Sequence, residues 1–427
     1  MTERPNIFGL LTKRRFAPLF VTQYFGAFND NFLKCAILAM VTFLLARDSG
    51  RAGMLTNLAM ALFMLPYFLF SAAAGNWVDA RDKSRCCRIV KIVEIVLMVL
   101  TAFALYFRIV WLLMFLLFCM GAQSTFFGPA KYSLLPQHLK EDELLAGNAL
   151  IEGGTFLAIL TGSIGGSLII VLPGGTLWAG GILVALAVVG CFASFQIPPA
   201  PPASPVGRLP RNLWRETCRT VGESLRHPVV GPCILALSVF WMAGALYVSL
   251  LPVLCLSVIG GNEVVNTLLL TLFSIGVGAG SLGAGWILKG AVSGRLAPWA
   301  MGGMAFFSAD LAWCSRSTAE FAELAGPGTL FCDLNFLRIA ADLLLTAFFG
   351  GMFSVPLQAL MQYSAPSGKT ARVIAANNIV NAVYMSGATL IAAAAHVLWD
   401  PPPGATAAVL AVVLLLNAWY CRAKIRQ

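Results

Sequence analysis

Charged side chains lie inside a segment that is long and apolar enough to cross a membrane. Asp30 and Lys34, with Asn29 and Asn31 beside them, occupy the middle of the run 16–45. A charge at membrane depth costs about 3 kcal/mol or more, so it normally faces a polar cavity or a partner. Asp30 and Lys34 are four residues apart on one helical face. There they can form a structural ion pair or jointly hold a ligand that carries both charges.

Two more ionisable residues, Lys131 and Glu152, lie in apolar runs of the same half of the chain as Asp30. Carboxylates beside lysines suit a zwitterionic ligand, because a lysine can hold a phosphate while a carboxylate holds an ammonium group. The rival interpretation is a proton or cation relay in which a carboxylate titrates. The residues alone leave both interpretations open.

The other ionisable residues of the apolar runs are expected nearer the membrane surfaces. Glu94 and Asp310 are placed close to an interface, and Lys91 is counted with the cytoplasmic loop that precedes it. Arg338 and Asp342 are four residues apart, so they are expected to pair near the outer boundary. A structural role is preferred for this pair.

The histidines do not support an enzyme. Three residues separate His138 from Asp142 and His396 from Asp400, whereas glycerolipid acyltransferases separate their catalytic His and Asp by four. The sequence has no GxSxG elbow, P-loop or HExxH. His138 is therefore expected in a hydrated loop without a catalytic role. No ATP-binding domain is recognisable either, so transport would be facilitated or ion-coupled.

The eleven cysteines are an odd number, lie mostly in apolar runs and include no CxxC pair. They are typical of small core residues, so neither a disulfide framework nor a zinc site is indicated. Cys314 and Cys332 flank the main external loop and are the pair considered for a disulfide. No metal and no cofactor are expected.

Composition predicts a membrane protein. With 59% hydrophobic and 11% charged residues the chain is too apolar for a soluble globular protein. The net charge of +10 does not indicate nucleic acid, because the basic residues fall in short segments between apolar runs. Their distribution places both termini in the cytoplasm, and the first apolar run is too long for a cleaved signal peptide. Twelve spans are predicted, at about 16–46, 52–78, 89–107, 109–135, 147–171, 176–197, 229–256, 264–288, 296–315, 337–360, 373–398 and 403–421.

A long cytoplasmic connection, 198–228, separates a six-helix half at 1–197 from a second at 229–427. The connection is Pro-rich at first, then basic and amphipathic. Its second part is expected to form a helix that lies on the anionic inner leaflet.

The two halves repeat internally. AGNALIE at 146–152 matches AANNIVN at 375–381, so that Asn148 corresponds to Asn377, and 126–135 matches 348–360. Twelve spans, a long central loop and related halves predict an all-α major facilitator transporter with its substrate site between the halves near the midplane.

A loop signature of the same superfamily lies between the second and third spans. A Gly is followed four residues later by Asp and then by alternating basic residues. The Gly allows two helices to approach closely, and the Asp can accept hydrogen bonds from basic groups and from the end of a neighbouring helix. This motif is assigned to gating and packing, and its residues are Gly75, Asp79, Arg81, Lys83 and Arg85.

Four stretches together resemble the bacterial lysophospholipid transporter family of the major facilitator superfamily. They are FVTQYFGAFNDNFLKCAI, FFGPAKYSLLPQ, AGNALIEGGTFLAILTGSIGG and FSVPLQALMQ. The resemblance implies a flippase that moves lysophospholipids such as lysophosphatidylethanolamine from the outer to the inner leaflet of the bacterial inner membrane. There an acyl-ACP-dependent acyltransferase restores the missing chain. Some relatives fuse the transporter to the acyltransferase and acyl-ACP synthetase, which are expected to be separate proteins here because the sequence ends at Gln427.

The resemblance also implies a binding site. Members without the fused enzymes carry an arginine in the seventh span, where this chain has Tyr247 and Val248, as in the fused type. Lys34 or Lys131 would then supply the phosphate clamp. The expected substrate-binding residues are Asp30, Lys34, Lys131, Glu152, Asn148, Asn29, Tyr132, Asn377 and Tyr247.

The expected partners are the lysophospholipid substrate and membrane lipids, and the protein is expected to be a monomer. Two other functions remain as alternatives. One is a proton-coupled exporter of drugs or small metabolites. The other is a membrane partner without transport activity that docks an acyltransferase through 198–228.

Overall fold

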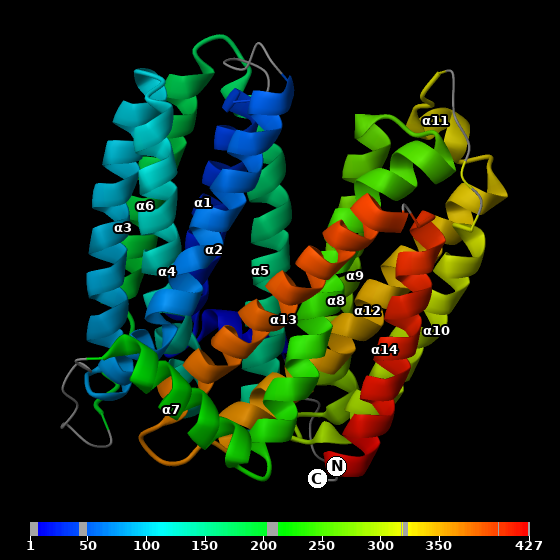
Figure 1. Ribbon diagram of the computed structural model, residues 1–427. Coiled ribbons are helices and arrows are strands. Elements are labelled where there is room, and N and C mark those ends of the chain that lie inside the picture. Colours follow the sequence, from blue (N-terminus) through cyan, green and yellow to red (C-terminus); the bar gives the residue numbers. More distant parts are fainter. Residues whose placement is uncertain are drawn as a thin grey trace. The chain divides into compact units, whose positions relative to one another are not determined.

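The structure, a computed structural model, describes residues 7–41, 49–202, 212–316, 318, 323–399 and 401–425. Each of the twelve apolar runs contains one long helix, so the chain is an all-α membrane protein with twelve transmembrane helices (Figure 1). Ten of the described helices are individually long and apolar enough to cross a membrane. The other two are α1, which carries the polar residues at its centre, and α10, which has 18 residues.

The helix bounds agree with the predicted spans to within a few residues, except that α3 and α5 begin about two turns earlier than predicted. The spans are α1 (Ala17–Ala39), α2 (Ser49–Asp79), α3 (Lys83–Tyr106), α4 (Val110–His138), α5 (Glu141–Ile170), α6 (Gly175–Phe195), α8 (Val230–Leu254), α9 (Glu263–Leu288), α10 (Ala297–Cys314), α12 (Leu334–Tyr363), α13 (Thr370–Trp399) and α14 (Pro403–Lys424). The shorter elements are η1 (Ile7–Thr12), α7 (Leu213–Arg226), η3 (Cys255–Ile259), η4 (Gly294–Leu296) and α11 (Pro327–Leu330). The end of the first run, 42–46, both chain termini and Asp400 lie outside the described residues.

The region between α4 and α5 differs from the prediction, and the difference changes the placement of His138. α5 begins at Glu141 rather than near 147, because Glu143 returns its side chain to the backbone N–H of Lys140 at 3.1 Å and caps the helix. His138 is the last residue of α4 and is half-buried, so the prediction of a hydrated loop was wrong.

The chain forms two compact units, which are described separately. The first contains Asn6–Ser224 together with Gln362–Ile379, the end of α12 and the start of α13. The second contains Leu225–Met361 and the chain from Val380 onward. The predicted division at 1–197, 198–228 and 229–427 stays a prediction.

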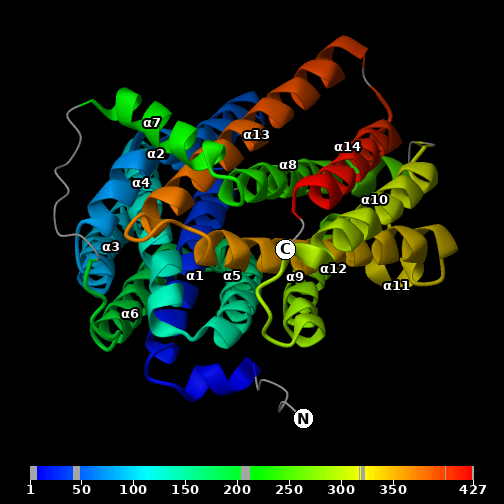
Figure 2. The ribbon, with the colours of Figure 1, turned by 90° about the horizontal axis from the view of Figure 1, so that it is seen from below.

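In the first unit α1 lies between α5 and α6, as Figure 2 shows end-on. The close contact with α5 depends on glycine. A Cβ at Gly162 would lie 2.6 Å from the carbonyl oxygen of Phe28, and one at Gly166 would overlap the carbonyl oxygen of Phe32. Small residues at this interface let the two backbones touch. Their contact fixes the turn of α1 that carries Asn29 and Asp30.

The amphipathic helix predicted in the central connection is present as α7. Two polar contacts join it to other elements of the first unit. Asn76 of α2 donates to Glu216 at 2.7 Å, and Lys369 forms an ion pair with Glu223 at 3.3 Å. Residues 203–211 of the connection lie outside the described residues.

In the second unit α14 packs against α8 and α10. α9 approaches α12 closely, because a Cβ at Gly280 would overlap the carbonyl oxygen of Phe348. Apart from an isolated bridge between Gly261 and Ala325, the described part of the chain is helical or irregular.

Candidate functional site

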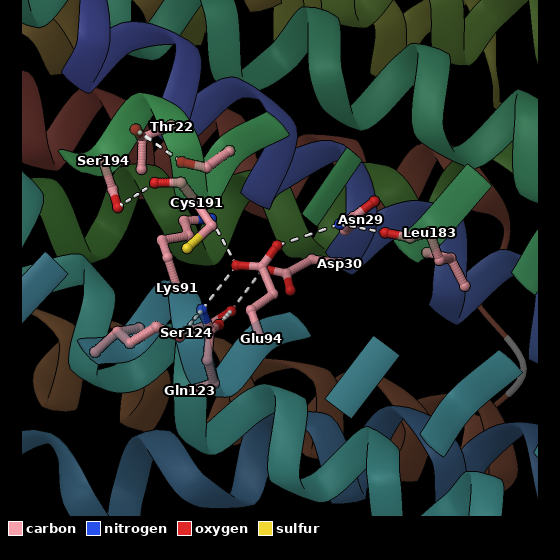
Figure 3. Close-up of polar contacts among 12 residues, drawn as sticks. Thr22, Asn29, Asp30, Lys91, Glu94, Gln123, Ser124, Leu183, Cys191 and Ser194 are labelled. Atoms are coloured by element: carbon pink, nitrogen blue, oxygen red, sulfur yellow. Dashed lines mark hydrogen bonds and ion pairs between the residues drawn. The ribbon is translucent and has the colours of Figure 1, made fainter. Parts of the chain in front are cut away.

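Asn29 and Asp30, in the polar turn of α1, contact different neighbours (Figure 3). Asn29 is fully buried, and its Nδ2 donates to Glu94 Oε1 at 3.2 Å and to the Leu183 carbonyl oxygen at 3.3 Å. Asp30 accepts a hydrogen bond of 2.7 Å from the hydroxyl of Ser124 on α4. Consecutive helical residues point about 100° apart, so this divergence follows from the helix itself.

Asp30 and Lys34 do not form the ion pair that their spacing allowed. No ion pair within 4.0 Å joins them in the described structure, and the Lys34 ammonium lies 4.5 Å from the ring centroid of Phe63 on α2. They still interact through space. Asp30 Oδ1 is buried and receives no hydrogen bond from any described residue. Both charges therefore keep the capacity to bind a further group.

The structure brings Lys131, Tyr132 and Glu152 near one another. The Lys131 ammonium interacts electrostatically with the carboxylates of Asp30 and Glu152, and it lies 4.8 Å from the ring centroid of Tyr132. Tyr132 also lies within electrostatic reach of Glu152. The first unit thus gathers two carboxylates and a lysine from α1, α4 and α5.

Two charged side chains of α3 are fully buried, at places that differ from those predicted from the sequence. Lys91 and Glu94 of α3 are both 0% exposed, and Lys91 Nζ lies 2.6 Å from Glu94 Oε2. The placement of Lys91 in a cytoplasmic loop and of Glu94 near an interface was therefore wrong. α3 begins at Lys83, which carries both residues into the helix bundle. Their i,i+3 spacing within an apolar run is the signal that could have identified the pair.

Glu94 is the centre of a network that reaches the candidate site. Gln123 Nε2 donates to Glu94 Oε2 at 2.9 Å, and Lys91 Nζ lies 4.7 Å from the ring centroid of Phe127. A buried ion pair needs such additional hydrogen bonds to offset its desolvation. Tyr67 of α2 is a further neighbour that interacts with Ser124 and Asp30. Gln123 and Tyr67 carry no charge and belong to no motif, so no signal in the sequence distinguishes them.

Asn148 is engaged by a partner distant in the sequence. Its side-chain amide and that of Gln362 exchange two hydrogen bonds, of 3.0 and 2.8 Å, and Asn148 also donates to the Leu144 carbonyl oxygen. Asn377 is buried too, and its Oδ1 accepts no hydrogen bond from the described residues. The predicted binding role of these residues stays a prediction.

In the second unit Tyr247 is buried, with its hydroxyl hydrogen-bonded to Ser308. The predicted pairing of Arg338 with Asp342 was wrong. Arg338 instead makes a two-pronged ion pair with Asp310, its Nε donating at 2.9 Å and its Nη2 to the other oxygen. Asp310 lies on α10, so the partner was chosen by helix packing rather than by spacing along α12.

Asp342 is buried beside this pair, with its Oδ2 lacking a hydrogen bond among the described residues. Its carboxylate, that of Asp310 and the Cys314 thiol have ligand atoms within 4.8 Å of one another. Cys314 and Cys332 are both free thiols, so the disulfide considered for them does not form.

The loop signature makes the contacts that its chemistry suggested. The Asp79 carboxylate accepts from the backbone N–H groups of Ala371 at 2.9 Å and Arg372 at 3.0 Å, in the first turn of α13. A Cβ at Gly75 would lie 2.8 Å from Ala375 Cβ. A carboxylate at a helix N-terminus is favoured both by the helix dipole and by unpaired amides.

The basic residues of this signature are less directly engaged. The Arg81 guanidinium lies 5.6 Å from the ring centroid of Trp77, Lys83 is buried at the start of α3, and the Arg85 backbone N–H is bound by Asp82. Asp82 is the N-cap of α3, which the sequence analysis did not identify. Burial raises its pKa, but hydrogen bonds from Ser84, Arg85 and Ala200 outweigh burial and hold the pKa below its usual value.

Known proteins are similar to this chain in sequence and in fold. The sequence model of the Major Facilitator Superfamily matches residues 20–389. The lysophospholipid transporter LplT of Cronobacter sakazakii is 28% identical over 373 residues, covering 84% of this chain and 83% of the relative. That of Klebsiella pneumoniae is 28% identical over 354 residues, covering 80% and 78%.

Solved structures agree at the level of the fold. The human organic anion transporter MFSD10 superposes with a TM-score of 0.74 at 12% identity, covering 95% of this chain and 98% of that one. The transporter FucP gives a TM-score of 0.69 at 13% identity, covering 96% and 99%. The helices, the loop signature and the matched sequence model agree, and the chain therefore belongs to the major facilitator superfamily.

Proposed function

We propose that this chain is a lysophospholipid flippase that moves lipids such as lysophosphatidylethanolamine from the outer to the inner leaflet of the bacterial inner membrane. There they are reacylated as part of phospholipid remodelling. Both chain termini would be cytoplasmic, and the two six-helix halves would alternate access to the substrate. The names of the sequence relatives support the substrate class.

One observation carries the proposal at the level of the site. Asp30 and Lys131 have opposite charges and interact across α1 and α4, yet no described ion pair within 4.0 Å consumes either one. A lysophosphatidylethanolamine headgroup carries an ammonium and a phosphodiester, which are complementary to this arrangement. A substrate that supplied only one charge would leave the opposite group without a counter-charge from the ligand.

The roles of the residues follow from their charges. Asp30, through its buried Oδ1, and Glu152 would contact the ammonium group. Lys131, with Lys34 four residues after Asp30 on α1, would bind the phosphodiester. The single acyl chain needs an apolar path beside the polar site, which transmembrane helices lined by Phe can supply.

The test is uptake of labelled lysophosphatidylethanolamine into spheroplasts that lack their own transporter, with and without this chain. We expect chain-dependent uptake that persists when the membrane potential is collapsed. Absence of uptake by protein shown to be folded in the membrane would contradict the proposal. Proton-coupled efflux of small molecules would then be measured, because it is the activity of the alternative exporter.

An acyltransferase that consumes the flipped lipid is the second expected partner. A variant in which the exposed basic residues Arg215 and Arg226 of α7 are replaced tests docking independently of flipping. Unchanged flux with lost acyltransferase recruitment would support a docking role for α7 in addition to transport.

A further inference from the structure

A series of side-chain contacts at hydrogen-bond distance connects the buried ion pair of α3 to Asp30 (Figure 3). Lys91 binds Glu94, Glu94 accepts from Gln123 at 2.9 Å, and Ser124 lies 3.2 Å from Gln123 Oε1 and 2.7 Å from Asp30 Oδ2. The series crosses from α3 to α4 to α1, inside one compact unit.

The direction of each hydrogen bond is fixed by the chemistry of Glu94. An ionised carboxylate only accepts, so the Gln123 amide must present its NH₂ group to Glu94. Its oxygen then faces Ser124. The Ser124 hydroxyl has one hydrogen, and its neighbours are Asp30 Oδ2, Gln123 Oε1 and the Tyr67 hydroxyl. The shorter and charge-assisted bond to Asp30 is the stronger one.

Glu94 holds α1 by a second route. Its Oε1 accepts from Asn29, the residue directly before Asp30. Lys91 is in turn confined by α1, because a Cβ at Gly26 would overlap the Lys91 ammonium. The pair therefore fixes the backbone of the Asp30 turn through Asn29 and the Asp30 carboxylate through Gln123 and Ser124.

We propose that Lys91 and Glu94 form a positioning unit for Asp30, acting through Gln123 and Ser124 to aim one carboxylate oxygen at the substrate ammonium. This inference rests on the proposed function, in which Asp30 binds that ammonium. Ser124 occupies Oδ2, which leaves Oδ1 for the headgroup. Once the ligand compensates the charge of Asp30, Gln123 Oε1 offers the Ser124 hydrogen an alternative acceptor. The carboxylate can then bind and release its ligand without an orphaned hydroxyl.

Two variants interrupt the series and keep both residues of the buried ion pair. Ser124→Ala removes the donor to Asp30, and Gln123→Leu removes the link between Glu94 and Ser124. Ser133→Ala is the matched control, since Ser133 is a buried serine of the same helix. Among the described residues its hydroxyl bonds only the Ala130 carbonyl oxygen.

The readout is the ratio of uptake of lysophosphatidylethanolamine, which has an ammonium group, to uptake of lysophosphatidylglycerol, which has none. Ser124→Ala and Gln123→Leu are expected to lower this ratio about tenfold, the value of one charge-assisted hydrogen bond. Ser133→Ala is expected to leave it unchanged. A purely structural role would lower the uptake of both lipids together and keep the ratio constant, which would overturn the inference.

Asp30→Asn separates this inference from the function on which it rests. If Asp30→Asn lowers the ratio while Ser124→Ala and Gln123→Leu do not, the positioning role is wrong and the ammonium-binding role of Asp30 stands. If Asp30→Asn also leaves the ratio unchanged, both roles fail. Absence of uptake of either lipid by the wild-type protein overturns the proposed function and this inference with it.

Discussion

Asn148 and Gln362, 214 residues apart in the sequence, bind each other through both atoms of their side-chain amides. Each amide is buried and supplies the donor that the other needs. In an apolar surrounding such a reciprocal pair is strong because neither group has water as an alternative partner. These two hydrogen bonds hold the end of α12 against α5 within the first unit.

Replacing one amide of this pair is expected to destabilise the protein more than replacing both. Asn148→Leu leaves the Gln362 amide buried without its partner, and we expect destabilisation of about 1–3 kcal/mol. The double variant Asn148→Leu/Gln362→Leu should recover most of that loss. Thermal unfolding of the purified protein in detergent measures both effects. Additive losses in the double variant would show that the two amides are energetically independent.

Gly75→Ala is expected to impair transport while the protein still reaches the membrane. The added methyl would lie 2.8 Å from Ala375 Cβ and 2.9 Å from Arg372 Cα, so α2 and the start of α13 would have to separate. Gly181→Ala on α6 is the control, because its Cβ would meet nothing within 4 Å. Equal flux in the two variants, at equal membrane levels, would show that transport does not require the close approach at Gly75.

Asp30→Asn and Lys131→Ala are each expected to reduce lysophosphatidylethanolamine uptake about tenfold or more at normal membrane levels. Each change removes one of the two charges that the headgroup would meet. Asp142→Asn, which neutralises an exposed carboxylate at the start of α5, should retain uptake. Full activity of both site variants would refute the assignment of the site.

Lys91→Met is expected to destabilise the protein by about 3–5 kcal/mol, because Glu94 would be left charged and buried without its partner. The double variant Lys91→Met/Glu94→Leu removes both charges and should be close to the wild type in stability. The measurement is the unfolding midpoint, together with the amount of protein in the membrane. A double variant as unstable as the single one would contradict this account of the pair.

The attachment of α7 is expected to weaken in acid. Burial raises the pKa of Glu216, but hydrogen bonds from Arg219 and Asn76 outweigh burial and hold the pKa below its usual value. A depressed pKa in the folded state means that the contribution is complete above the unfolded value of 4.5 and is lost as the pH falls through the folded value.

Hydrogen exchange of residues 213–226, corrected for intrinsic rates, should therefore rise as the pH falls below about 4.5, the ordinary pKa of a glutamate. Glu216→Gln should exchange faster at neutral pH and lose most of this dependence. The same acid response in Glu216→Gln would assign the effect to another carboxylate.

The sequence by itself determined the features that depend on local physics. The length and apolarity of each run predicted the twelve helices to within a few residues, since a helix that spans lipid must satisfy its own backbone and present apolar side chains. The signature from Gly75 to Asp79 predicted a close helix contact and a bound helix end, and both are present. The basic periodicity of the central connection predicted α7.

Only the tertiary structure decided which buried polar groups meet. Arg338 pairs with Asp310 on another helix instead of Asp342 on its own, and Lys91 and Glu94 lie in the bundle rather than at its edge. A buried charge takes the partner that gives it the most hydrogen bonds at the least desolvation, and such partners come from helices far apart in sequence. Spacing along one helix states which residues share a face. The packing of the neighbouring helices determines what that face meets.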